Sequence, residues 1–217
     1  MNHKPLVSVI VPSYNHSGYI VECIKSIFHQ SYDHFELIVI DDGSTDSTLE
    51  TLLKIKKNEK NIFVINHEIN YGQSIALRTG VSNSNYDYIV TLDGDAQNDP
   101  KDILRILKFF DEKKEFMMVI GNRVNRNDRM AKKIASRLAY KVRKIILKDD
   151  TPDTGCAIKV FRKSDFINLP FFNHIHRFMP YLFKTFKGNV ISIEVNHRAR
   201  KSGVSKYSNF QRFLVGI

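Results

Sequence analysis

The chain has 217 residues, of which 42% are hydrophobic, and carries a formal net charge of +10 at pH 7. The length suits one large domain or a core domain with an appendage. The apolar content predicts a packed core and excludes an intrinsically disordered chain. No apolar run reaches the length of about 18 residues that a membrane-spanning helix needs.

Short apolar runs alternate with stretches of helical periodicity in the first half of the chain. The first run lies near the N-terminus without a signal-peptide cleavage pattern, so it is interpreted as a strand. The predicted strands are, in chain order, Leu6–Pro12, Phe35–Asp41, Ile62–Asn66, Tyr86–Asp93, Phe116–Gly121 and, later, Asn189–Val195.

Apolar residues at helical spacing predict a helix after each of the first four strands. The positions are Ile20, Ile24, Ile27 and Phe28; Leu49, Leu52 and Leu53; Ser74 to Val81; and Ile103, Leu107 and Phe110. Ser44 and Thr45 are predicted as N-caps of the second helix. This alternation predicts an α/β fold with a mostly parallel, Rossmann-like sheet flanked by helices.

Three polar clusters follow predicted strands: PSYNH begins at Pro12, DDGSTD at Asp41 and DGDAQ at Asp93. A plain turn needs only one or two such residues. In a parallel sheet the carboxyl ends of the strands share one edge, where ligands bind. Carboxylate and amide oxygens from Asp93, Asp95 and Gln97 would suit Mg²⁺ or Mn²⁺ beside a diphosphate. A binding site is therefore favoured over ordinary turns.

Several other chemistries lack their motifs. The sequence has no GxxxxGK[ST] phosphate loop, no GxGxxG after the first strand, and neither HExxH nor GxSxG. His174 and His176 lack cysteine partners and make a poor zinc site. Cys23 and Cys156 form neither a CxxC motif nor a disulfide framework, so a reducing cytoplasmic setting is expected.

Charge is divided unevenly along the chain. Residues 1–120 contain 12 Lys and Arg against 17 Asp and Glu, whereas residues 121–217 contain 21 against 6. The cationic excess of the second half predicts an anionic partner, which could be nucleic acid, a membrane surface or a phosphorylated substrate.

A basic segment lies within this second half. Ile134, Leu138, Val142 and Ile145 fall on one helical face, surrounded by Lys and Arg. The pattern fits a surface helix packed on the core or an amphipathic helix, Ala131–Lys148, in a membrane interface. Nucleic-acid binding is not expected, because the segment has a single aromatic residue.

Taken in order, the motifs resemble one enzyme family. The stretches are VIVPSYNH, VIDDGSTDST, NYGQSIALRTG, LDGDAQNDP, DTGCAIKVFRK and NHRARKSGVSKY. They resemble the family 2 glycosyltransferases of GT-A fold, and within them the polyprenyl-phosphate branch of dolichol-phosphate mannosyltransferase-like and bacterial undecaprenyl-phosphate enzymes. The resemblance runs from Leu6 to Tyr207. It implies a single GT-A catalytic domain over residues 1–217, with a nucleotide-sugar-binding half (1–120) and an acceptor-binding, membrane-facing half (121–217).

The resemblance also implies roles for single residues on the donor side. The nucleotide base would be held by Pro12, Tyr14 and Asp41, with Asp42 nearby. Mg²⁺ or Mn²⁺ would be bound by Asp93, Asp95 and Gln97. Asp93 would also lie close to the ribose, and Asp95 would be needed for catalysis.

On the acceptor side, the resemblance implies that Arg123, Ser136 and Arg200 bind the phosphate of the acceptor. Asp153 would act as a base or as an orienting group. Because Arg200 follows the predicted strand Asn189–Val195, it is expected to leave the sheet edge on a loop that can close over bound substrate.

The chain departs from the family pattern at a few positions. His16 stands where Glu is common after "YN", and Gly94 and Ala96 replace the more usual Ala and Leu. Trp is absent from the chain, so the QxxRW signature of processive synthases is absent too. That absence disfavours a polymerising enzyme.

These features predict transfer of a sugar from a nucleotide diphosphate sugar, UDP- or GDP-linked, to a polyprenyl phosphate (undecaprenyl or dolichyl). The enzyme would be peripheral at the cytoplasmic face of the membrane. A phosphate monoester, with a second pKa of about 6, needs a cationic clamp more than a general base. The alternatives are a glycosyltransferase acting on a sugar hydroxyl and, more distantly, a non-enzymatic basic module that binds anionic surfaces. The sugar, the oligomeric state and any continuation beyond Ile217 are left open.

Overall fold

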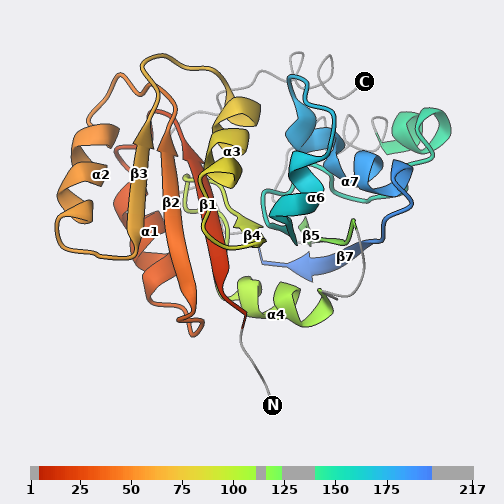
Figure 1. The fold of residues 1–217 in the computed structure, drawn as a ribbon, viewed down its shortest axis with the longest axis horizontal. Coiled ribbons are helices and arrows are strands. Elements are labelled where there is room, and N and C mark those ends of the chain that lie inside the picture. Colours follow the sequence, from red (N-terminus) through yellow and green to blue (C-terminus); the bar gives the residue numbers. More distant parts are fainter. Residues whose placement is uncertain (1–4, 111–115, 124–139, 197–217) are drawn as a thin grey trace.

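The computed structural model describes residues 5–110, 116–123 and 140–196. Within these ranges the strands form one seven-stranded sheet in the order β3-β2-β1-β4-β6-β5-β7 (Figure 1). The strands are β1 (Val7–Ser13), β2 (Phe35–Asp41), β3 (Ile62–Asn66), β4 (Tyr88–Thr91), β5 (Met118–Arg123), β6 (Lys159–Arg162) and β7 (Val190–Val195). Neighbouring strands are parallel except at β6, which runs antiparallel to β4 and β5. The predicted α/β fold with a mostly parallel sheet is confirmed.

Helices cover both faces of the sheet. They are α1 (Ile20–Phe28), α2 (Thr48–Lys56), α3 (Gln73–Ser82), α4 (Asp102–Phe109), α6 (Lys163–Ile167) and α7 (Ile175–Thr185). Apolar residues of α1, α2 and α4 share one core with one face of the sheet, while those of α3, α6 and α7 share a second core with the other face. All residues of β2 are buried, as expected for a strand covered on both faces.

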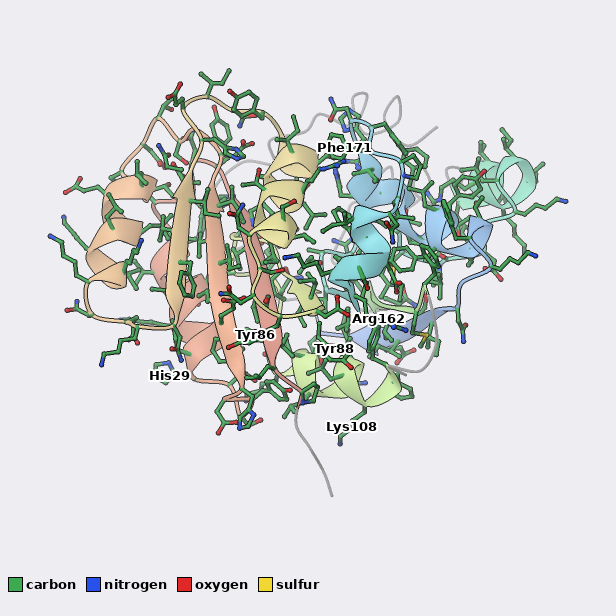
Figure 2. The ribbon with its side chains drawn as sticks, viewed as in Figure 1. His29, Tyr86, Tyr88, Lys108, Arg162 and Phe171 are labelled. Atoms are coloured by element: carbon green, nitrogen blue, oxygen red, sulfur yellow. The ribbon has the colours of Figure 1, made fainter. Side chains whose placement is uncertain are left out.

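The carboxyl ends of the parallel strands share one edge. The loop from β3 to α3 crosses the upper end of the molecule in Figure 1, opposite the N-terminus. Tyr88 and Arg162, which are paired in register, lie toward the lower edge in Figure 2, and Phe171 lies at the upper end. The upper edge is the one on which the polar clusters are expected to meet.

The start of α2 was predicted wrongly. The helix begins at Thr48 with Ser47 as its N-cap residue, not with Ser44 or Thr45. The side chains of these two residues are engaged elsewhere: Ser44 Oγ donates to Asp41, and the Thr45 side chain contacts Asn15. The polar residues expected to cap a helix instead organise the loop after β2.

The elements β6, α6 and α7 were not predicted. β6 is only four residues long and carries a lysine inside an apolar run, so its pattern is weak. α7 contains Pro180, which disfavours a helix in a sequence-based prediction. It still buries Met179, Leu182 and Phe183 against the sheet, and this packing outweighs local propensity.

The basic segment is described only from residue 140 onward. Residues 140–146 are helical, and Ile145 and Ile146 are 78% and 68% exposed. Ile134 and Leu138 lie outside the described residues, so the basic amphipathic helix stays a prediction. In the described ranges, no helix combines the length and apolar character needed to cross a membrane.

Candidate active site

The loops after β1 and β2 are hydrogen-bonded to each other. The Asn15 N–H donates to Ser44 Oγ at 2.9 Å, and Asn15 Oδ1 accepts the Thr45 N–H at 2.8 Å. Asn15 has a φ of 50°, a left-handed conformation that Asn tolerates better than most residues. Because Pro12 pairs in register with Ile40, these bonds hold the PSYNH and DDGSTD clusters side by side.

The carboxylates of Asp41 and Asp42 form hydrogen bonds with different neighbours. Asp41 is fully buried, and its carboxylate accepts hydrogen bonds from the Ser44 hydroxyl and, at 3.3 Å, from the Ser44 N–H. The predicted role of Asp41 in base binding remains a prediction.

Asp42 organises the loop between β3 and α3. Its Oδ1 lies 2.8 Å from His67 Nδ1 and accepts the Tyr71 N–H at 3.0 Å, and its Oδ2 accepts the Gly72 N–H at 2.8 Å. Gly43 permits this close approach: its φ is +68°, and an added Cβ would lie 2.3 Å from the carbonyl carbon of Ile69. Asp42 therefore supports the loop between β3 and α3 at the carboxyl edge of the sheet.

The DGDAQ loop contacts the PSYNH loop. A Cβ added at Gly94 would lie 2.9 Å from His16 Nδ1 and 3.3 Å from the Pro12 carbonyl oxygen. Asp93 Oδ1 accepts a hydrogen bond from Gln73 Nε2 at 3.0 Å, and Asp95 Oδ1 accepts the Gln97 N–H at 3.2 Å. The structure thus brings the three predicted clusters together and adds Gln73, which sequence reasoning missed.

The side-chain oxygens of the DGDAQ loop suit a divalent cation that binds together with a diphosphate. Across the described ranges, no group of three or more His, Cys, Asp or Glu is arranged to hold a metal ion. Asp93 and Asp95 supply two carboxylates, and Gln97 lies beside them. Mg²⁺ commonly takes one or two carboxylates from the protein and completes its shell with substrate phosphates and water.

Arg123 and Asp153 form a buried pair on the other side of the site. Arg123 Nε lies 2.6 Å from Asp153 Oδ2, and Nη2 lies 2.8 Å from Oδ1. Burial alone would lower the pKa of Arg123, but the hydrogen bonds and charge of Asp153 outweigh it and raise that pKa. The negative charge of Asp93 also acts to raise the pKa of Arg123, so the pair lies near the DGDAQ loop.

Lys159 of β6, which is paired in register with Thr91 of β4 and Ile120 of β5, was missed from sequence. The residue is 5% exposed, and its Nζ donates to the carbonyl of Cys156. Burial lowers the pKa of Lys159, while the charges of Asp93 and Asp153 oppose that shift. Its signal in the sequence is a single lysine inside the apolar run CAIKVF.

Arg143 adds a second cation near Asp153. Burial lowers its pKa, and the charges of Asp149 and Asp153 act against that effect. Its buried Nε has no hydrogen-bond partner in the described part of the chain. Ser136 and Arg200, which were predicted to bind the acceptor phosphate, lie outside the described residues, so their roles remain predictions.

The sheet order, the antiparallel β6 and the acidic loop after β4 define the GT-A class of folds. The mannosyltransferase PcManGT from Pyrobaculum calidifontis, solved in complex with GDP-Man and Mn²⁺, has the same fold, with a TM-score of 0.69 and 19% identity. The match covers 92% of this chain and 58% of that chain.

The family model described as "Glycosyl transferase family 2" matches residues 8–169, and the chain belongs to this family. Dodecaprenyl-phosphate galacturonate synthase of Rhizobium johnstonii is 33% identical over 96% of this chain and 64% of its own length. Undecaprenyl-phosphate 4-deoxy-4-formamido-L-arabinose transferase of Photorhabdus laumondii is 33% identical over 93% of this chain and 63% of its own length. The chain therefore spans less than two thirds of these relatives.

Proposed function

We propose that the chain is the catalytic domain of a polyprenyl-phosphate glycosyltransferase. It transfers a sugar from a UDP- or GDP-linked donor, with Mg²⁺ or Mn²⁺, to a polyprenyl phosphate at the cytoplasmic face of the membrane. The names of the two relatives support a polyprenyl phosphate acceptor. The observation that carries the proposal is the buried Arg123–Asp153 pair beside the DGDAQ loop.

The donor binds at the edge formed by the three loops. The nucleotide base lies against Pro12, Tyr14 and Asp41, and the diphosphate lies at Asp93 and Asp95. Asp93 and Asp95 would hold a divalent cation there, and its charge would offset the negative charge that grows on the leaving nucleoside diphosphate. Without it, two carboxylates would repel the diphosphate, by about 4 kcal/mol for each pair of unit charges at 4 Å and an effective dielectric of 20.

The acceptor is already a nucleophile at neutral pH. Its phosphate oxygen attacks the anomeric carbon of the sugar, and the bond from that carbon to the diphosphate breaks. No proton has to be removed from a largely ionised phosphate, so Asp153 acts as an orienting group for Arg123. The resulting cationic clamp consists of Arg123, Arg143 and Arg200, and the hydroxyl of Ser136 also binds the acceptor phosphate.

Transfer to a sugar hydroxyl is the second candidate, and the geometry of Asp153 disfavours it. A hydroxyl acceptor needs a general base with a pKa near the working pH. Both oxygens of Asp153 accept hydrogen bonds from the Arg123 side chain, and a paired cation favours the ionised, weakly basic carboxylate.

The membrane part of the proposal rests on the end of the basic segment. Ile145 and Ile146 are exposed next to Lys141 and Lys144. An exposed apolar pair flanked by lysines suits the interface of an anionic membrane. This surface would bring the active site to the lipid acceptor.

The experiment that tests the proposal is a donor panel. The protein is incubated with UDP- and GDP-linked sugars, Mn²⁺ and undecaprenyl phosphate, and the lipid product is identified by mass spectrometry. The proposal expects one donor to give a polyprenyl-phosphate sugar. If no donor in a broad panel modifies the lipid, while sugar hydroxyl acceptors are modified, the acceptor assignment is wrong.

A further inference from the structure

The first turns of α3 and α7 meet through Ser74 and His176. Ser74 Oγ and His176 Nδ1 lie 2.8 Å apart although 102 residues separate them in the chain. Both helices lie on the same side of the sheet (Figure 1). Ser74 directly follows Gln73, whose Nε2 donates to Asp93 Oδ1. His176 is thus linked, through two adjacent residues of α3, to a carboxylate of the metal-binding loop.

His176 is uncharged at neutral pH. Burial, together with the positive charges of Lys159 and Arg177, lowers its pKa to about 3. Because Ser74 engages Nδ1, the ring has Nε2 as its other hydrogen-bonding atom, a donor in one tautomer and an acceptor in the other. A sugar hydroxyl can both donate and accept, so it suits either tautomer. A diphosphate would instead be bound by a cation.

The transferred sugar has to lie between the donor metal and the acceptor phosphate. Asp93 marks the donor end of this span, and the Arg123–Asp153 pair marks the acceptor end. Lys159 lies within the span, since it is paired in register with Thr91 of β4 and Ile120 of β5. His176 lies near the Asp93 end of this span, because its Nδ1 is 2.8 Å from the hydroxyl of Ser74, the residue that follows Gln73, whose side chain donates to Asp93 at 3.0 Å.

We infer that His176, positioned by Ser74, hydrogen-bonds a hydroxyl group of the donor sugar and thereby contributes to the choice of sugar. The inference rests on the proposed function, because it requires a nucleotide diphosphate sugar as donor. If His176 only held α7 against α3, its loss would weaken the binding of every ligand at the three polar loops by the same factor. If His176 binds the sugar, its loss would weaken the binding only of ligands that carry the sugar.

The test compares two ligands on the same protein. Calorimetry with Mn²⁺ measures the affinity of the complete nucleotide sugar and of the same nucleoside diphosphate without its sugar. The His176→Ala protein is expected to bind the nucleotide sugar at least 10-fold more weakly, with the nucleoside diphosphate unchanged within 2-fold. Ser74→Ala is expected to show a smaller loss in the same direction. If the alanine variant does not fold, His176→Asn, which keeps a hydrogen-bonding side chain, takes its place in the same comparison of the two ligands.

His174→Asn is the matched control. His174 lies just before α7 with a φ of 69°, a conformation that Asn also tolerates, and its ring centre is 6.2 Å from that of His176. The control should leave both affinities unchanged. Equal losses of both ligands in the His176 variant, no loss at all, or the same loss in His174→Asn would overturn the inference. A wild-type protein that transfers no sugar would contradict the proposed function itself, whereas sugar transfer that does not depend on His176 contradicts only this inference.

Discussion

Arg123 and Asp153, 30 residues apart in the chain, form a two-point ion pair, with distances of 2.6 and 2.8 Å between their nitrogen and oxygen atoms. The two side chains are 15% and 7% exposed. Removing one partner from such a pair leaves a buried charge without its counter-charge and costs about 3–5 kcal/mol. The pair therefore fixes the orientation of the Arg123 guanidinium before any ligand binds.

This pairing predicts a specific effect of Asp153→Asn. The asparagine keeps the shape of the side chain but cannot hold both guanidinium donors, so Arg123 loses its fixed orientation. Steady-state kinetics should show a KM for polyprenyl phosphate raised about 10-fold, with kcat reduced less than that. If Asp153 is instead a general base, kcat should fall about 10²–10⁴-fold with little change in KM.

The metal assignment predicts that Asp95→Ala abolishes transfer. Removing the carboxylate takes away a direct ligand beside the diphosphate, and the expected loss in kcat is about 100-fold or more. Mn²⁺ binding in the presence of nucleoside diphosphate, followed by electron paramagnetic resonance, should weaken in parallel. Asp99→Ala is the control, since Asp99 accepts the Lys101 N–H and lies outside the DGDAQ motif. Full turnover by Asp95→Ala in excess EDTA would refute the assignment.

The close packing of the donor loops predicts that Gly43→Ala destabilises the protein. Alanine would need a φ of +68° and would place its Cβ 2.3 Å from the carbonyl carbon of Ile69. The strain alone costs about 1–3 kcal/mol, and each kcal/mol lowers the melting temperature by roughly 2–4 °C at this chain length. Gly18→Ala is the matched control, because nothing lies within 4 Å of its added Cβ. Equal melting temperatures for the two variants would show that the loop packing is looser than described.

The membrane proposal predicts that the double variant Ile145→Ser with Ile146→Ser binds anionic vesicles less tightly. A fully buried isoleucine contributes about 1.5–3 kcal/mol, so a co-sedimentation assay should show at least a 10-fold loss. Phe109→Ser is the control, because Phe109 is also exposed (53%) but lies on α4, away from the basic segment. Wild-type binding that is equal on neutral and anionic vesicles, or insensitive to salt, would count against an electrostatic interface.

The three polar loops at the carboxyl edge of the sheet could be predicted from sequence, because the patterns that indicate them are local. Strands such as Phe35–Asp41 are continuous apolar runs, and each polar cluster directly follows one of them. The rest of the site depends on contacts between distant parts of the chain. Gln73 reaches Asp93 and Ser74 reaches His176 only after α3 and α7 have packed on the sheet. No periodicity in the sequence encodes such pairs.

Contacts between distant parts of the chain also explain why Ser44 and Thr45 were wrongly assigned as N-caps. Both residues have the chemistry of an N-cap and precede a helix, which is the usual local signal. Asp41 and Asn15 compete for the same side chains once β1 and β2 lie next to each other. Tertiary contacts decided the outcome, and the helix begins later, at Thr48.

The most direct test of the central claim compares a polyprenyl phosphate with the polyprenyl alcohol of the same chain length. Both are supplied in detergent with the donor that the panel identifies and with Mn²⁺, and transfer of labelled sugar to lipid is measured. The account predicts rapid transfer to the phosphate and none to the alcohol, because the proposed mechanism uses an ionised phosphate as the nucleophile and removes no proton from the acceptor. Transfer to the alcohol at a comparable or higher rate would contradict it.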